Sequence, residues 1–285
     1  MNKLNKKQWL RLIKISFFII GSVALLGFAK SLRNSETLKS IEIVIENDSL
    51  NRFITKDDVM QLLNDQGFRV VGEKMKDINL HRLETLLGQH AGVKKIDAFC
   101  SIEGILHIQI TQRNPMLRIF DTTGENYYID EDGYLMPTLS NYTARVPVAT
   151  GFISDPAFKL GITIQQIDES DSLRKVCIVD DLYKLSKAIQ NDTFLQAQIV
   201  QIQVNDEKEF ELIPLVGADE IIVGDISDLN EKIEKLKLFY SQSLPSAGLN
   251  TYKTINLKYK GQVVGVKRTD TAQNNNNQTI SNKQH

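Results

Sequence analysis

The sequence predicts an α+β protein with three parts: an N-terminal transmembrane helix, a small domain of order β-α-α-β-β, and a mainly antiparallel β-domain with a few helices. Three observations support this fold class. An apolar segment follows a basic N-terminus, two amphipathic helix patterns lie between alternating strand patterns, and strand patterns predominate from residue 113 onward. The 285 residues suffice for two domains that each bury a core.

The apolar segment at residues 9–29 predicts the transmembrane helix. Its 21 residues would rise about 32 Å, enough for a hydrocarbon core of about 30 Å if Arg11 and Lys14 extend toward the headgroups. The first 29 residues carry five basic and no acidic side chains, so we expect a cytoplasmic N-terminus and an extracytoplasmic C-terminal domain. The alternative is a signal peptide cleaved after Ala29, because the small-x-small ending there suits a signal peptidase.

The charge beyond this segment is mildly acidic. Residues 30–285 hold 29 basic and 35 acidic side chains. Binding to nucleic acid requires a basic face that displaces counterions. The composition therefore argues against a nucleic-acid partner.

Residues 40–112 predict the small domain. Alternating isoleucines indicate a strand at 41–46, and two later strands are expected at 93–100 and 105–111. Between them, Thr55 with Asp58 has the spacing of a capping box, and Asn79 caps a second helix. Two helices laid across one face of a three-stranded sheet would bury all three apolar stripes.

Residues 113–267 predict the β-domain. Asp132-Gly133 indicates a hairpin turn, and a last hairpin is expected to turn at Lys260-Gly261 between strands 254–259 and 262–267. Other strands are expected at 199–204, 210–215 and 221–223, with helices at 180–191 and 229–241. The remaining segments are predicted to be a cytoplasmic tail at 1–8, a linker at 30–39 and a disordered polar tail at 268–285.

The sequence predicts no catalytic residue, cofactor, metal or small-molecule substrate. A calcium-like loop at Asp130 lacks both its first and its last ligand, so we interpret it as a turn. Ser172 begins a Ser-x-x-Lys motif without the companion motifs of penicillin-recognising enzymes.

Cys100 and Cys177 allow one disulfide or two free thiols. Cys100 lies at an apolar position of the predicted strand, which favours a buried free thiol. The four histidines have no spacing suited to a metal: His81, His90, His107 and His285.

Several short motifs follow one another along the chain. The first domain has Asn79-Leu80, Val93 and Leu106-x-Ile108-x-Ile110-x-x-Arg113-x-Pro115. The second has Tyr128-Ile129-Asp130-x-x-Gly133, then Ile221-Ile222-Val223-Gly224 before Glu231-Lys232-Ile233, then Ile255-Asn256-Leu257-Lys258-Tyr259. In this order, over about residues 8–267, the chain resembles the bacterial cell-division family FtsQ, called DivIB in some lineages. In that family the first domain is a POTRA domain.

The resemblance implies a non-enzymatic scaffold of the bacterial divisome, anchored as a single-pass protein in the cytoplasmic (inner) membrane at the division septum. Its implied partners are FtsB- and FtsL-like bitopic proteins, other divisome proteins and membrane lipid, and it would link them to septal peptidoglycan synthesis. The edge of a final hairpin strand can accept a partner strand by β-augmentation. The candidate partner-binding residues are Lys237, Tyr240, Tyr259, Gly261, Gln262, Val263, Val264, Gly265 and Val266.

Two other functions compete with this interpretation. A POTRA-containing factor for polypeptide transport or assembly would have repeated POTRA units and a long run of barrel strands. The sequence instead predicts one such unit followed by about 150 residues. A membrane-anchored cell-wall enzyme rests on the Ser172 motif alone.

Overall fold

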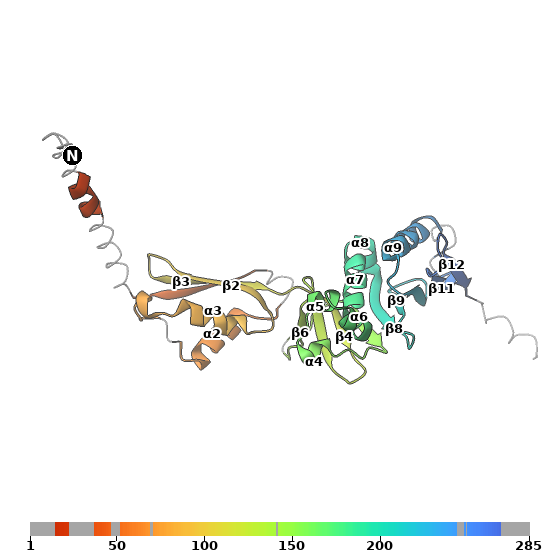
Figure 1. Cartoon of the computed structure of the whole chain (residues 1–285), viewed down its shortest axis with the longest axis horizontal. Helices are drawn as coiled ribbons and strands as arrows, with labels where there is room; N and C mark the ends of the chain where they lie inside the picture. Colours follow the sequence, from red (N-terminus) through yellow and green to blue (C-terminus); the bar gives the residue numbers. More distant parts are fainter. Residues whose placement is uncertain are drawn as a thin grey trace, which may run out of the picture. The chain divides into compact units, whose positions relative to one another are not determined.

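The computed structural model in Figure 1 describes residues 15–22, 37–46, 52–68, 71–140, 142–243, 248 and 250–268. The chain divides into two compact units, one ending at Arg113 and the other beginning at Asn114. Each unit has its own hydrophobic core.

The predicted transmembrane helix is not supported. In the part of the chain that the structure describes, no helix combines the length and the apolar character that crossing a membrane requires. Residues 15–22 form a helix, and eight residues rise only about 12 Å. The other residues of the predicted 9–29 span lie outside the described residues, as do 1–8, 30–36 and 269–285, where most of the predicted tails and linker fall.

The first unit has the predicted β-α-α-β-β order. Its three-stranded sheet has the order β1-β3-β2, with β1 parallel and β2 antiparallel to the central β3. The helices α2 and α3 pack against this sheet and supply Val59, Leu63, Leu83 and Leu87 to the core. The elements are β1 (Ser40–Glu46), α2 (Lys56–Asp65), the 3₁₀ helix η1 (Met75–Asp77), α3 (Leu80–Gly88), β2 (Val93–Cys100) and β3 (Ile105–Gln112).

Two hydrogen-bond arrangements fix the start of α2. The capping box is confirmed: the Asp58 N–H donates to Thr55 Oγ1, and the Thr55 N–H donates to Asp58 Oδ2 at 2.8 Å. The second arrangement was not predicted. The fully buried Gln112 of β3 accepts the backbone N–H groups of Phe53 and Ile54 at 2.9 and 3.2 Å. It thereby attaches the helix entry to the sheet.

The second unit is built on one nine-stranded sheet of order β12-β11-β10-β9-β8-β7-β4-β5-β6. Five of its strand pairs are antiparallel, whereas β10–β11, β7–β8 and β4–β7 are parallel. The sheet is therefore mainly antiparallel, as predicted. Its strands are β4 (Pro115–Phe120), β5 (Asn126–Asp130), β6 (Leu135–Pro137), β7 (Val148–Gly151), β8 (Ile199–Val204), β9 (Phe210–Pro214), β10 (Glu220–Gly224), β11 (Tyr252–Asn256) and β12 (Val264–Lys267).

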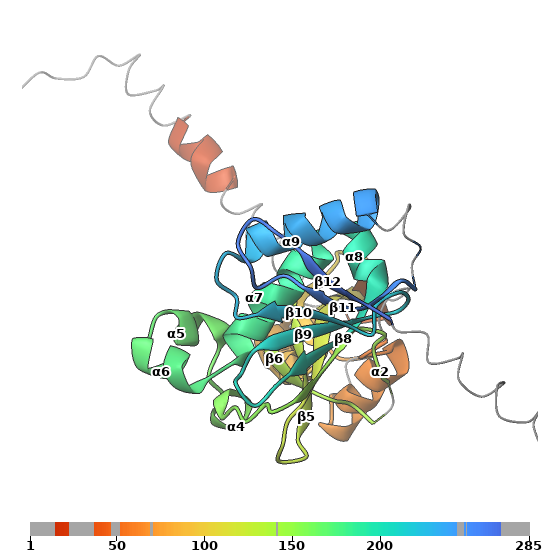
Figure 2. The same ribbon diagram turned by 90° about the vertical axis from the view of Figure 1, so that its right-hand side faces the viewer.

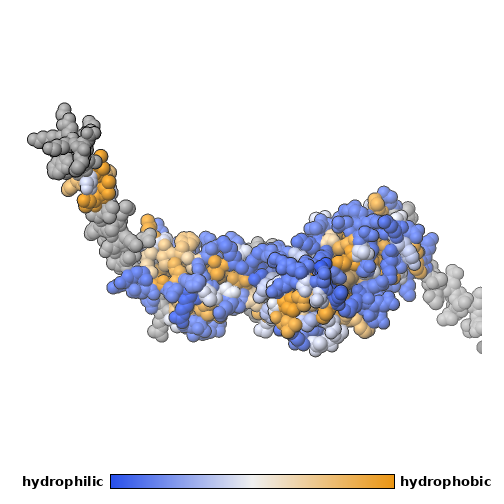
Figure 3. Space-filling model, in the orientation of Figure 1, coloured by the Kyte–Doolittle hydropathy of each residue, from blue (hydrophilic) through white to orange (hydrophobic). Residues whose placement is uncertain are grey.

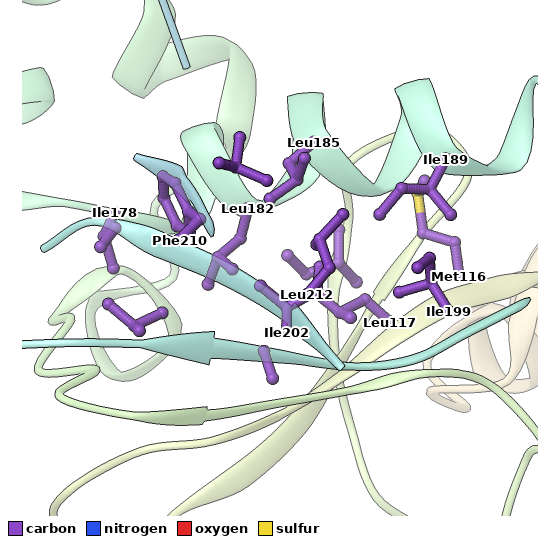
Figure 4. Packing of buried hydrophobic residues seen from close by; sticks show 14 of the residues in the cluster. Met116, Leu117, Ile178, Leu182, Leu185, Ile189, Ile199, Ile202, Phe210 and Leu212 are labelled. Atoms are coloured by element: carbon purple, nitrogen blue, oxygen red, sulfur yellow. The ribbon is translucent and has the colours of Figure 1, made fainter. Parts of the chain in front are cut away.

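Helices of the second unit cover one face of this sheet. Figure 4 shows Leu182, Leu185 and Ile189 of α7 pointing toward the sheet, and all three are buried. Leu182 and Leu185 lie toward Phe210 and Leu212, whereas Ile189 lies beside Met116 and Ile199. Figure 2 shows α9 next to β12. The helices are α4 (Ala157–Leu160), α5 (Ile164–Asp168), α6 (Asp171–Val176), α7 (Val179–Gln190), α8 (Thr193–Gln198) and α9 (Leu229–Leu238), which continues as the π-helix η2 (Phe239–Ser243).

Candidate partner-docking edge

Strand β12 ends the large sheet and pairs antiparallel with β11 alone among the described strands. The Arg268 N–H donates to Thr251 O at 2.9 Å, on the β11 side. Successive residues of a strand direct their backbone groups to opposite sides. The backbone groups of Val264 and Val266 therefore face β11, whereas those of Gly265 and Lys267 face the open edge.

The predicted last strand is too long at its start. β12 begins at Val264, and Gln262 and Val263 belong to the connection from β11. Gly261 lies in a turn with φ of 69°, a left-handed conformation that suits glycine. Its N–H donates to Glu231 Oε1 of α9 at 3.1 Å. The turn is thus held to the helix rather than extended along the sheet.

Strand β12 exposes two apolar side chains, Val264 and Val266, on the face away from the helices. The face of the protein shown in Figure 3 is largely hydrophilic, yet Val264, Val266 and the nearby Tyr259 are all exposed, Val266 by 53%. On the helix side, a Cβ atom on Gly265 would lie 2.5 Å from Cδ1 of Tyr252. The Tyr252 ring therefore lies directly on the strand, and Phe239 of η2 packs edge-on against that ring at 5.1 Å between centroids.

Two lysines of α9 fix the position of this region, Lys235 by holding the last hairpin and Lys232 by holding the start of α9, and the sequence interpretation missed both. Lys235 Nζ donates to Leu257 O at 3.1 Å and to Tyr259 O at 2.7 Å. Lys232 is buried, and its Nζ contacts the carboxylate and the carbonyl oxygen of Asp225. The available signal was their spacing of three residues, which places both on one side of a predicted helix beside its apolar face.

Lys237 and Tyr240 lie on a different part of α9 and η2. Lys237 Nζ contacts Glu234 Oε1 at 3.0 Å and Asp192 Oδ2 at 3.3 Å, and these contacts raise the pKa of Lys237. The ring of Tyr240 is buried against Phe194 of α8, 5.0 Å between centroids, and burial raises its pKa. Both residues line a groove of about 380 Å³ between α8 and α9. The structure therefore separates them from the seven predicted residues in and before β12.

The last hairpin is strongly basic. Residues 251–268 contain five basic and no acidic side chains. Two of the five are paired: Lys258 with Glu209 at 2.6 Å, which raises the pKa of Lys258, and Arg268 with Asp219. Lys253, Lys260 and Lys267 form no ion pair with other residues that the structure describes. These three cations leave an excess of positive charge beside the open edge.

The opposite edge of the sheet is less suited to pairing. β6 has three residues and ends at Pro137, which has no N–H to donate. The preceding turn is fixed by Asp130, whose Oδ1 accepts the N–H groups of Asp132 and Tyr134. This confirms the turn interpretation of that acidic segment. β12 is the better edge for a partner strand.

Among the described residues, no group of three or more His, Cys, Asp or Glu side chains is placed to hold a metal ion. Cys177 is a buried free thiol and Cys100 a half-buried one; burial raises the pKa of both, that of Cys177 to about 11. Ser172 lies on the short helix α6.

The fold is that of two compact domains, each with its own core, the second ending in a strand that pairs on one side among the described strands. A family model described as FtsQ/DivIB, C-terminal related, matches residues 114–266, more than half of the chain. A POTRA-like domain model matches residues 37–111. The chain therefore belongs to the FtsQ/DivIB-related family, whose members are non-enzymatic division scaffolds. No curated protein matches the sequence.

Proposed function

We propose that this protein acts at the division septum, where it holds FtsB- and FtsL-like proteins and connects them to septal peptidoglycan synthesis. The observation that supports this proposal is the open β12 edge in a domain that the FtsQ/DivIB-related model covers. A partner segment adds to β12 as a further strand of the large sheet.

The edge supplies both affinity and selectivity. The backbone groups of Gly265 and Lys267 provide hydrogen bonds, each worth about 0.5–1.5 kcal/mol net. The exposed side chains of Val264, Val266 and Tyr259 provide apolar contacts for alternate side chains of the incoming strand. The unpaired lysines favour a segment with acidic residues and speed its association.

The groove between α8 and α9 gives the same partner a second contact. Its lining includes Phe194 and Leu238, both large and about half exposed, together with the predicted residues Lys237 and Tyr240. Phe239 connects the two surfaces, because it packs toward β11 while the next residue, Tyr240, packs toward α8. A partner that adds a strand to β12 and continues past η2 reaches this groove.

Imaging tests the proposed cellular role. A fluorescent fusion of the full chain is expected to concentrate at mid-cell before constriction, and depletion of the protein is expected to give filaments, because septation then lacks its scaffold. A fusion with normal activity that stays evenly distributed throughout the division cycle would refute the role.

A further inference from the structure

The sheet of the first unit also has an edge strand, β2, with eight residues. The Ser101 N–H donates to Ile105 O at 2.9 Å and so faces β3. By the alternation of backbone groups along a strand, Ile96, Ala98 and Cys100 direct theirs away from β3, toward the edge. An exposed edge of this length is a template for pairing with another chain.

This edge is closed at its centre by a side chain of α3. The Glu84 carboxylate accepts the Ala98 N–H at 2.9 Å. An incoming strand would need that N–H for its own hydrogen bond. To pair there it would have to displace Glu84, which loses a charge-assisted bond to the backbone.

The side chains of β2 are complementary to a second copy of β2. If two copies run antiparallel with Ile96 opposite Ile96, Lys95 of each copy lies opposite Asp97 of the other. Both side chains are exposed and lie on the same face, where they pair with each other at 2.6 Å. Opposite charges at facing positions stabilise a strand pair, and the two-fold arrangement forms this contact twice.

We propose that Glu84 prevents this protein from dimerising through β2. The carboxylate occupies the Ala98 N–H that lies near the middle of the self-complementary segment. Exposed Phe99 and Ile102, at the end of β2 and in the turn after it, add apolar area that the pairing of two copies would bury. The role is distinct from the proposed docking at β12, which lies in the other unit.

Sedimentation of the full chain tests the proposal with a matched pair of variants. Glu84→Ala frees the Ala98 N–H and suits the interior of a helix, so this variant is expected to shift from monomer to dimer as its concentration rises. Glu84→Gln keeps an oxygen that accepts the N–H and is expected to remain monomeric, like the wild type. A Glu84→Ala variant that stays monomeric while its circular dichroism matches the wild type overturns the proposal.

Charge reversal tests the arrangement of the two copies. Adding Lys95→Glu to Glu84→Ala places two acids opposite each other and is expected to abolish the dimer. Adding Asp97→Lys as a third change restores opposite charges and is expected to restore dimerisation. Dimerisation that is unaffected by either of these charge changes overturns pairing through β2.

Amide hydrogen exchange gives an independent measurement of the contact between Glu84 and the edge. The Ala98 amide is expected to exchange faster in dilute Glu84→Ala than in Glu84→Gln, and equal rates overturn the closing role of Glu84.

Discussion

Asp225 shows how single residues position the docking edge. Its carboxylate accepts the Ser227 hydroxyl and the Lys232 ammonium, and these contacts lower its pKa to about 2. Lys232 is buried, so this ion pair anchors the start of α9. The same helix carries Lys235, which holds the turn before β12.

The lowered pKa predicts how this anchor depends on pH. A carboxylate whose pKa falls on folding stabilises the folded state above its unfolded pKa, near 4, and loses this effect as pH falls toward 2. We expect Asp225→Asn to lower the free energy of unfolding by about 1 kcal/mol at pH 7, a modest value because Asp225 is largely exposed. Urea unfolding of both proteins at pH 7 and near pH 2 measures this, and the difference is expected to be much smaller at the lower pH, where the folded-state carboxyl is partly protonated. A difference that is independent of pH would show that the charge is not the cause.

Contacts between residues that are close in the sequence could be predicted, whereas contacts between residues that are far apart in the sequence could not. Thr55 and Asp58 are three residues apart, so their capping box is visible in the sequence itself. Gln112 and Lys235 act on backbone atoms that are far away in sequence. Their polar side chains give no local pattern, and only the folded chain identifies their partners.

At the scale of elements, one buried carboxylate organises the start of α7. Asp155 accepts the N–H groups of Ile178 and Val179, the latter at 3.0 Å, and that of Ala157 at 2.8 Å. It is 6% exposed. A helix start of this kind must have its orphan donors satisfied, and here the acceptor comes from 23 residues earlier in the chain.

Removal of this acceptor is expected to destabilise the second unit. Asp155→Ala leaves buried N–H groups without a partner, at a cost of about 1–3 kcal/mol in the free energy of unfolding. Asp155→Asn keeps one acceptor oxygen and is expected to cost less. Denaturant unfolding followed by far-UV circular dichroism measures both. Equal stability of wild type and Asp155→Ala would show that α7 does not depend on this cap.

The last hairpin explains an element boundary that the sequence misplaced. Apolar residues continue from Val263 through Val266, so the pattern suits a strand from Gln262. Tertiary contacts override it: Glu231 and Lys235 of α9 hold the turn through Gly261 and Tyr259. Strand alternation likewise gave no indication of the parallel pairs β4–β7, β7–β8 and β10–β11, because such pairs join strands that are distant in sequence.

At the scale of the whole molecule, the sequence predicted both domain types correctly. It also predicted one element, the transmembrane helix, that the structure does not support. The domain types follow from periodicity and capping signals that are repeated over many residues, so errors in single elements leave them intact. The transmembrane helix rested on the hydropathy of one segment, and only residues 15–22 of it are a described helix. Of the predicted docking residues, Val264, Gly265 and Val266 lie in the edge strand, whereas Lys237 and Tyr240 lie at the α8–α9 groove.

The most direct test of the docking edge is the affinity of the full chain for an FtsB/FtsL-like complex after Lys267→Pro and Lys267→Ala. Both changes remove the charge, but only proline removes the N–H that faces the open edge, and an edge position away from β11 tolerates proline. We expect Lys267→Pro to bind at least about tenfold more weakly than Lys267→Ala, equivalent to about 1.4 kcal/mol, with melting temperatures that agree. Equal affinities of the two folded variants would contradict strand addition at β12.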